Sequence, residues 1–395
     1  MPIITKTIEK DTTTIFCCDI THAMKKKVCI IHKTKTLDPR SFYKEARTLL
    51  KAGYDVCIIG LYGKNETVNG IRLIGFKPPD KRLILFFITN YKIFIQAFKE
   101  KAYIYHFHDL DFIPWAVLLK ILNRSKVIYD IHEAYPEYML LKTYVPKIVR
   151  IFLYILIYIL EHAAIKFFDA IVPNDNYISN GFNHKNNVVI FNFPTLDFFR
   201  NGNNCVPWQD REFDLFYPGS LPKYHFEAMM NIAENLNSEK VGNRWGIVTN
   251  SKSTIEWAKV EIEKRKLEKN FVFLPYTDYL NVYEYLSTAK IGIIPLPPYK
   301  KFMKNIPLKM FEFMGAGLPV VLSDLPPSRQ FIKGENCGIS VEPDNIGEYV
   351  RAIKILLSNP EKSIEMGENG KKLVYEKYNW TIEEKKLLNL YGNLV

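Results

Sequence analysis

The stretch NIPLKMFEFMGAGLPVVLSD (residues 305–324) places one lysine and one glutamate on an otherwise apolar helix that leads into a buried strand. Asn305 can cap this helix and Gly317 suits its exit, so the pattern predicts a helix over residues 306–316. Pro307 in the first turn agrees with this start. The segment therefore predicts a helix of about three turns that is followed by a core strand.

The two charged residues of this helix, Lys309 and Glu312, are three positions apart and share a face. Ionised groups in apolar surroundings need a partner, and a bound polar ligand at the positive end of the helix would supply one. The alternative is an ordinary surface ion pair, although lysine before glutamate is the less favourable order for such a pair. The pair outlines a nucleotide site, which the rest of the chain must support.

Composition and charge limit the classes of protein. A chain of 395 residues, 48% hydrophobic and 24% charged, is typical of a soluble globular protein with two or three domains. The net charge of +11 is uneven, because residues 1–200 carry +10 and residues 201–395 carry +1. A basic face attracts nucleic acid, an anionic membrane or an acidic substrate. We expect no nucleic-acid partner, since no nucleic-acid motif is present and the lysines are scattered.

Two apolar segments leave two interpretations open. Residues 151–160 form a strongly apolar run that is too short to span a bilayer, which needs about 20 residues. Residues 81–101 scatter basic side chains through a second apolar helix. Each is either an ordinary core helix or a helix lying on a membrane. The six cysteines form no CxxC pair and no secretory signal precedes residue 24, so we expect a cytoplasmic protein, with a peripheral position on the inner face of the cell membrane as one option.

Strand and helix patterns alternate from Lys27 onward and restart after an irregular stretch rich in Asn, Pro and Gly. Continuous apolar strands such as residues 126–132 are typical of parallel sheets buried on both faces. The sequence therefore predicts two similar α/β domains with a ligand cleft outside the carboxyl ends of their strands. The predicted division is an extension over 1–24, a first domain over 25–195, a linker over 196–211, a second domain over 212–378 and a terminal helix over 379–395.

Polar residues follow several of the predicted strands. After the first strand of the second domain come Gly219, Ser220 and Lys223, whose backbone N–H groups and ammonium could meet a phosphate. No GxxxxGK[ST] loop or GxGxxG turn follows the first strand of the chain, which disfavours ATPase and dehydrogenase functions.

Histidines and carboxylates end two neighbouring strands of the first domain. A metal site needs three or four converging ligands, and the candidates are His106, His108, Asp109 and Asp111, followed by His132 with Glu133. The simpler interpretation is that His132 donates a hydrogen bond to a substrate oxygen at the cleft. A third possibility is a buried histidine whose partners lie within the protein.

With these elements in place, the chain resembles the retaining glycosyltransferases of family 4, which have the GT-B fold: two Rossmann-like domains that face each other across a cleft. The resemblance covers nearly all of residues 25–391. It rests on DPRSFYKEARTLLKAGYDVCIIG, KVIYDIHEAYPE, YLSTAKIGIIPL and the opening segment extended through GENCGISVEP.

The resemblance implies a role for each of these residues. The second domain would hold a nucleotide diphosphate sugar, with Glu312 on the ribose and Lys309 facing the diphosphate. His132 matches the family histidine that contacts the donor sugar and its phosphate from the first domain. That domain would receive the acceptor, with Arg40 and His108 as acceptor-side candidates, and the terminal helix would cross back to it. No metal or other cofactor is expected, since lysine and helix dipoles would replace the metal.

Two departures from the family pattern concern the same site. Lys304 stands where the family has a glutamate that holds the sugar hydroxyls, and His225 stands where many members have Arg or Lys. The expected function is retaining transfer of a hexose to a glycan or polyprenyl-linked acceptor, as in bacterial cell-surface polysaccharide or lipopolysaccharide synthesis. The alternative is a non-catalytic GT-B protein that binds a sugar nucleotide or glycan. A hydrolase is less favoured because paired acidic groups are not evident.

Overall fold

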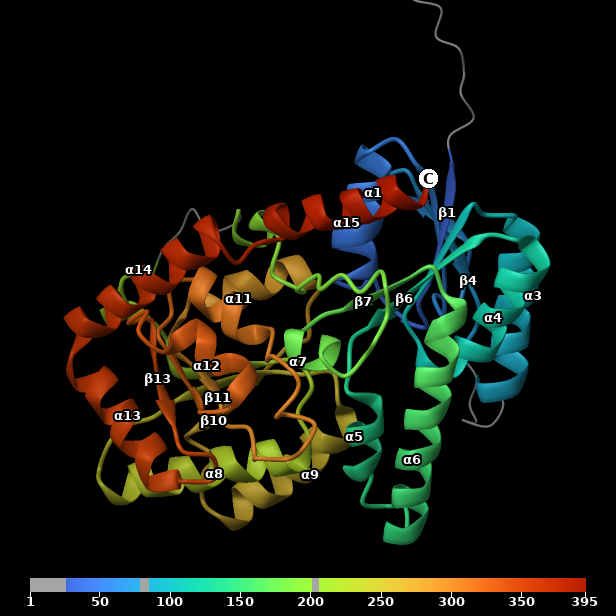
Figure 1. The fold of residues 1–395 in the computed structure, drawn as a ribbon. Coiled ribbons are helices and arrows are strands. Elements are labelled where there is room, and N and C mark those ends of the chain that lie inside the picture. Colours follow the sequence, from blue (N-terminus) through green and yellow to red (C-terminus); the bar gives the residue numbers. More distant parts are fainter. Residues whose placement is uncertain (1–25, 79–84, 201–205) are drawn as a thin grey trace, which may run out of the picture.

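Two α/β units lie side by side in the computed structural model (Figure 1), which describes residues 26–78, 85–200 and 206–395. The predicted extension over residues 1–24 lies outside these described residues. Each unit has its own sheet and its own hydrophobic cores on the two faces of that sheet. The expected α/β fold with two Rossmann-like domains is confirmed.

The first sheet has the strand order β3-β4-β2-β1-β5-β6-β7. All its neighbouring pairs are parallel except β3 with β4, an edge hairpin that the sequence pattern did not reveal. The strands that carry the apolar runs are buried on both faces, as the sequence predicts. The bounds are β1 Lys27–Ile31, β2 Asp55–Gly60, β3 Glu66–Val68, β4 Ile71–Gly75, β5 Ile104–Phe107, β6 Lys126–Ile131 and β7 Ala170–Pro173.

Helices cover both faces of the first sheet. One face is packed by a π-helical segment, Ser41–Ala46, that continues into α1 (Arg47–Lys51), where the sequence predicts a single helix over 39–52. The opposite face is packed by α3 (Asn90–Glu100), α4 (Ile113–Asn123) and the end of α6 (Lys147–Ala164). A short helix, α5 (Tyr135–Leu140), leads from β6 toward α6 and lies beside it.

The second sheet has six parallel strands in the order β10-β9-β8-β11-β12-β13. Its strands are β8 Phe213–Pro218, β9 Trp245–Val248, β10 Phe271–Leu274, β11 Ala289–Ile294, β12 Val320–Ser323 and β13 Gly338–Val341. Its helices are α8 Lys223–Ser238, α9 Lys252–Lys264, α10 Val282–Leu286, α11 Lys309–Gly315, α12 Pro326–Ile332, α13 Ile346–Ser358 and α14 Pro360–Glu376. The apolar side chains of α8 and α13 pack on one face, and those of α11 pack on the other.

Helix α11 is shorter than the sequence predicts. It spans Lys309–Gly315, and Leu308 precedes it without a side-chain cap. The expected cap, Asn305, is engaged elsewhere, because its side-chain amide bonds the backbone of the first domain at His132 and Ala134. The chain therefore reaches helical geometry only after Pro307 has closed a turn with Met310.

The terminal helix α15 (Trp380–Leu394) leaves the second domain and packs on the first, across the top of Figure 1. Its first residue, Trp380, donates its indole N–H to the Thr48 hydroxyl over 2.9 Å. Near its other end the hydroxyl of Tyr391 lies 2.9 Å from Nδ1 of His106, a residue of β5 in the first sheet. Helix α15 therefore ties the two domains together behind the cleft.

For helix α6 the structure decides against one of the two predicted alternatives. An ordinary core helix is excluded, because only 17% of its most apolar 18-residue window is buried. The predicted run of residues 151–160 belongs to a longer helical segment, Lys147–Phe167, of 21 residues, which by length and composition is apolar enough to cross a membrane. In Figure 1 the helix stands beside α5 and extends away from the first sheet.

Candidate active site

A cavity of about 640 Å³ opens between the two domains, within the size range of small-molecule sites. From the first domain it is lined by His132 and by residues of α5 and the turn after it, such as Tyr138 and Leu141. From the second domain it is lined by the start of α11, including Lys309, and by the turn before α8, including Ser220. The cavity therefore lies outside the carboxyl ends of strands from both sheets, where such folds bind ligands.

Side chains of the second domain close this cavity against α5. Lys301 pairs with Glu133 over 2.8 Å, and Lys304 pairs with Glu137. Asn305 donates to the backbone oxygen of His132 over 3.1 Å and accepts from Ala134 over 3.3 Å. Lys304, the departure from the family's glutamate, therefore contacts a carboxylate of the first domain and is not among the residues that line the cavity.

His132 is held by its neighbours in the first domain. Its Nε2 lies 2.5 Å from Nδ1 of His108, and its Nδ1 lies 3.4 Å from a carboxylate oxygen of Asp130. Burial lowers the pKa of both histidines well below the usual value, although the charge of Asp130 opposes this shift. Both rings are therefore neutral near pH 7. A hydrogen bond from His132 to a substrate requires its ring to turn away from these partners.

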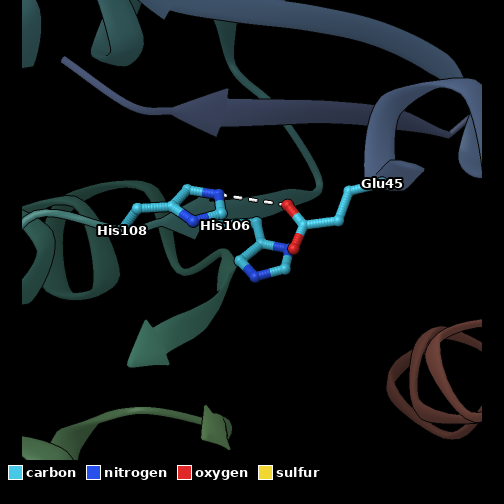
Figure 2. Close-up of side chains that lie close together, drawn as sticks. All are labelled: Glu45, His106 and His108. Atoms are coloured by element: carbon cyan, nitrogen blue, oxygen red, sulfur yellow. Dashed lines mark ion pairs between the residues drawn. The ribbon is translucent and has the colours of Figure 1, made fainter. Parts of the chain in front are cut away.

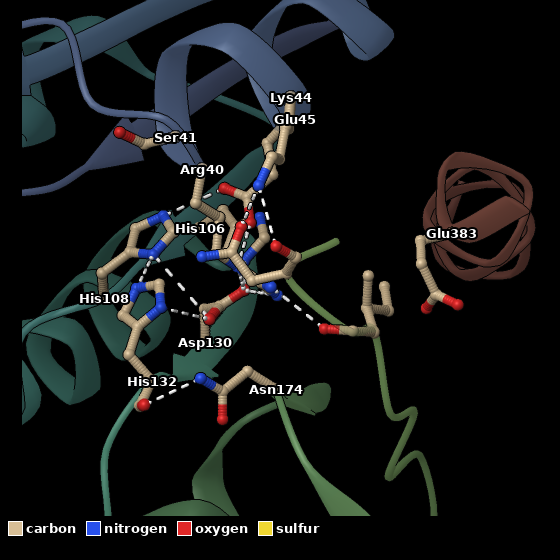
Figure 3. A network of polar contacts seen from close by, with 12 residues as sticks. Arg40, Ser41, Lys44, Glu45, His106, His108, Asp130, His132, Asn174 and Glu383 are labelled. Carbon is tan, nitrogen blue, oxygen red and sulfur yellow. Dashed lines mark hydrogen bonds and ion pairs between the residues drawn. The ribbon is translucent and has the colours of Figure 1, made fainter. Parts of the chain in front are cut away.

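Arg40 stands at the centre of the buried polar cluster behind His132 (Figure 3). Its guanidinium contacts Asp130 over 2.6 Å and Glu45 over 2.8 Å, and it donates to the backbone oxygen of Ile190 over 3.0 Å. Burial opposes the charge of Asp130, but Arg40 and His132 outweigh this effect and lower its pKa. The expectation that Arg40 and His108 face the acceptor is wrong, because both side chains are buried in the cluster and only 1% exposed.

Part of this cluster has the composition of a metal site. Glu45, His106 and His108 bring three ligand atoms within 4.8 Å of one another, and Figure 2 shows the carboxylate turned toward His108, with Nε2 at 3.1 Å. However, Arg40 already supplies a positive charge to Glu45, and a cation there would face the guanidinium at close range. The donor set therefore fits a cation poorly. That the donor site works without metal stays a prediction.

Lys309 faces the cavity from the second domain with no ion pair to Glu312 among the described residues. Its Nζ lies 3.7 Å from the centre of the Tyr217 ring, a cation–π contact. Burial lowers the pKa of Lys309 to about 7, and the charge of Glu312 offsets this only in part. Lys309 is thus a half-buried amine that faces the cavity without a carboxylate within ion-pair distance among the described residues.

Glu312 lies behind the cavity and not on its wall. Burial raises its pKa, while the charges of Lys44 and Lys309 act in the opposite direction. Lys44 reaches this position from the first domain, where its ammonium bonds the backbone oxygen of Asn192 over 2.9 Å. The surface ion pair considered for Lys309 and Glu312 is not formed among the described residues, and Glu312 instead feels the charges of two lysines from different domains.

The residues of the predicted phosphate loop do not all lie at the cavity. Ser220 lines the cavity, and Gly219 adopts a φ of +100°, a conformation that glycine takes without strain. Lys223 lies instead over the Trp257 ring at 4.9 Å, outside the cavity wall, and does not meet the other candidates. His225 takes its place: it lines the cavity, its Nδ1 bonds the Tyr217 hydroxyl over 2.9 Å, and burial lowers its pKa.

Sequence reasoning missed the residues that support His132. Asp130 and His132 are two apart on one strand end, as are His106 and His108 on the next, and such residues point to the same face. The rings of His106 and His108 are stacked at 5.1 Å. This spacing was a usable signal for the cluster. The partners Arg40 and Glu45 come from a distant helix, and only the fold brings them there.

The fold has close counterparts among solved structures. Sucrose-phosphate synthase from Thermosynechococcus elongatus superimposes with a TM-score of 0.72 at 16% identity, over 94% of this chain and 99% of that one. HepE from Anabaena, in complex with UDP and glucose, gives 0.67 at 10% identity, over 93% and 100%. The lipopolysaccharide outer core galactosyltransferase WaaB, in its apo form, gives 0.60 at 11% identity, over 94% and 100%. The chain has the GT-B fold of glycosyltransferases.

The family match in the sequence lies in the second domain. Residues 209–373 match the family described as glycosyl transferases group 1, so the second domain is a group 1 glycosyltransferase domain. An uncharacterized glycosyltransferase of Methanocaldococcus jannaschii is 27% identical over 188 residues, and one of Haemophilus influenzae is 28% identical over 113. These matches cover 46% and 28% of this chain and 45% and 30% of the relatives, so the chain spans less than half of either.

Proposed function

We propose that this chain transfers a hexose from a nucleotide diphosphate sugar to a glycan or lipid-linked acceptor with retention of the anomeric configuration. The observation that carries the proposal is the cavity between the domains, with Lys309 on one wall and His132 on the other. A GT-B relative, Anabaena HepE, binds UDP and glucose, which supports a nucleotide sugar as donor.

The donor diphosphate would lie against the second domain. Lys309 would change from a neutral or half-charged amine to an ammonium as the anion binds, because the anion raises its pKa again. Ser220 and the unpaired Nε2 of His225, which has no hydrogen-bond partner among the described residues, supply further polar contacts. Neither contact needs a divalent cation, so metal-independent binding is part of the proposal.

The transfer step would occur on one face of the sugar. As the bond from the anomeric carbon to the diphosphate breaks, the acceptor oxygen bonds to that carbon from the same side, and its proton passes to the departing diphosphate. Lys309 neutralises the charge that develops on the leaving group. His132 assists by turning a ring nitrogen from His108 toward the sugar. No paired carboxylates line the described cavity wall, so a covalent glycosyl-enzyme is not invoked.

The proposed setting is the cytoplasm, at the inner face of the membrane, in polysaccharide or lipopolysaccharide synthesis. Its support is the charge of +10 on residues 1–200, which suits an anionic surface or a polyprenyl diphosphate acceptor. The structural relatives include a lipopolysaccharide galactosyltransferase, which agrees with such a pathway.

The test is release of nucleoside diphosphate from a panel of sugar nucleotides, with the wild-type protein and Lys309→Met in parallel. We expect the wild type to turn over one donor and Lys309→Met to bind that donor at least tenfold more weakly. Release from no donor, with saturable binding to one, would instead support the second candidate, a non-catalytic sugar-nucleotide-binding protein. The observation that favours this candidate is Lys304, whose pairing with Glu137 leaves no carboxylate in the family's position for the sugar hydroxyls.

A further inference from the structure

The outward face of α6 is apolar over its whole length. Ile148 is 82% exposed, Phe152 is 61% exposed, and Ile155 and Ile159 are 50% and 57% exposed. Their spacing of three or four residues places them on one stripe of the helix. Exposed apolar stripes of this size are rare on monomeric soluble proteins and mark a surface that something covers.

The inward face of the same helix carries its polar groups. Glu161 is buried and accepts from the Tyr129 hydroxyl over 2.7 Å, and Arg150 donates to the backbone oxygen of Leu140 over 2.7 Å. A helix at a water-exposed surface normally has the opposite arrangement, with polar side chains outward. The inversion indicates that the outward face of α6 lies against an apolar medium.

The apolar surface extends beyond α6. Helix α4 packs beside it and exposes Ile121 and Leu122, and the turn after α6 exposes Phe167. We call the exposed apolar stripe of α6 the apolar face; its members are Ile148, Phe152, Ile155 and Ile159, and exposed apolar side chains of neighbouring elements lie nearby in the fold.

The rim of the apolar face is cationic and aromatic. Lys147 and Lys166 are exposed near its two ends, and Tyr158, 47% exposed, lies on the same helix beside it. Within Lys147–Phe167 the only carboxylate is Glu161, which points inward. A second copy of this chain would bring lysines against lysines, whereas anionic lipid headgroups complement them. Basic ends with interfacial tyrosine are typical of a helix that lies in a membrane surface.

The place of α6 in the fold does not suit a helix that spans a bilayer. Both of its ends belong to one folded domain: the N-terminal end packs against α5, and the C-terminal end leads through the 3-10 turn Ile165–Phe167 into β7. A spanning helix would place these two ends on opposite sides of the bilayer, which the single sheet that contains β6 and β7 does not permit.

We propose that the apolar face docks on a lipid bilayer and thereby sets the mouth of the cavity at the membrane surface. The turn that leads into α6 lines the cavity with Leu141, Lys142 and Tyr144, so the docked helix and the cavity share a wall. A lipid-linked acceptor would reach the cavity by diffusion in the membrane. This acceptor route rests on the proposed function, whereas the docking itself does not.

The test compares two double substitutions that differ only in their place. Ile155→Gln with Ile159→Gln alters the apolar face, and Ile355→Gln with Ile364→Gln alters exposed isoleucines of the second domain. Binding is measured by sedimentation with vesicles of phosphatidylcholine alone and with about one third phosphatidylglycerol, in 0.1 and 0.5 M NaCl. We expect tighter binding to the anionic vesicles, binding that persists in part at high salt, and at least a tenfold loss in the α6 variant alone.

Three outcomes would overturn the docking: no vesicle binding by the wild type, equal loss in both variants, or a light-scattering dimer that the α6 substitutions abolish without vesicle binding. Donor turnover in the absence of vesicles separates this proposal from the proposed function. An α6 variant that keeps normal donor turnover and loses vesicle binding supports docking. If the wild type binds vesicles but turns over no donor, the proposed function is wrong, while the proposal that the apolar face docks on a bilayer is still supported.

Discussion

The two walls of the cleft differ in whether their charged side chains have partners of opposite charge. On the first domain, Arg40 compensates Asp130 and Glu45, and both nitrogens of His132 face protein partners. On the second domain, Lys309 has neither a hydrogen bond nor an ion pair among the described residues. The buried charges of the first wall are thus paired within the protein, whereas the ammonium of Lys309 has no charged partner within ion-pair distance among the described residues. This difference agrees with the proposed function, in which the second wall would bind the donor and the first wall would hold His132 in place.

The largest expected effect concerns the first wall. His132→Ala should lower kcat by about 10²- to 10⁴-fold, the usual contribution of a positioned acid or base, while donor affinity changes by a small factor. Steady-state kinetics together with equilibrium binding of the donor measure the two quantities separately. His184→Ala, a histidine that bonds the backbone of Phe168 in the same domain, is the matched control. A kcat that stays within threefold would remove His132 from the chemistry.

The second prediction tests whether Arg40 completes the first wall. Arg40→Met should lower the free energy of unfolding by about 3–5 kcal/mol, because it leaves two buried carboxylates without their cation. Lys309→Met should leave the free energy of unfolding unchanged or raise it, since burial already disfavours the ammonium there. Urea denaturation of both variants makes the comparison. Equal destabilisation by the two substitutions would contradict the difference between the walls.

The third prediction concerns donor binding at Lys309. Lys309→Met should weaken binding of the nucleotide diphosphate sugar by about ten- to a hundredfold, since a hydrogen bond to a charged group contributes about 1.5–3 kcal/mol. Isothermal titration with the donor and with the free nucleoside diphosphate gives the two affinities. Lys309→Arg keeps the positive charge and should retain most of the affinity. If the methionine variant binds both ligands normally, the anion lies elsewhere.

A fourth prediction follows from the lowered pKa of Lys309. In the free protein this pKa is about 7, so the ammonium that the diphosphate requires is lost as pH rises above 7. Donor affinity should therefore fall above pH 7, by at most about tenfold per unit, and be flat below it down to about pH 6. His132 and His225 stay neutral across this range, because burial lowers their pKa values. The pH profile of donor affinity should be flatter in Lys309→Arg. This result would show that the titrating group is Lys309 and not Lys44.

Sequence patterns predicted the parts of this molecule that depend on local order. The continuous apolar strands correctly predicted two sheets of mostly parallel strands. The candidates Lys309 and His132 lie on the two walls of one cavity. The failures concern partners that are distant in sequence. Arg40 was expected on the acceptor side, but the fold places it on Asp130, 90 residues away. Asn305 resembled a helix cap, but a backbone group of the opposite domain takes its side chain.

The apolar helix α6 shows a different limit. Its composition left both a core helix and a membrane-surface helix open, because periodicity alone does not say which face is covered. The position of Glu161 decides: its carboxylate faces Tyr129 inside the domain, so the apolar stripe faces outward. A single buried carboxylate therefore fixes the orientation that the hydrophobic pattern left open.

The smallest expected effect lies where the two walls meet. Lys304 and Glu137 form a partly exposed ion pair across the cleft, and such a pair contributes about 1 kcal/mol or less. Lys304→Met should change the free energy of unfolding by no more than this, leave kcat within a few-fold and raise KM modestly. Lys301→Met, which breaks the neighbouring pair with Glu133, should behave alike.

In contrast, Lys304→Glu restores the family's residue but sets it against Glu137, so like charges should weaken closure of the cleft and raise KM further. Normal KM in Lys304→Glu, with an altered preference among donor sugars, would show that position 304 contacts the sugar and that the pair is dispensable.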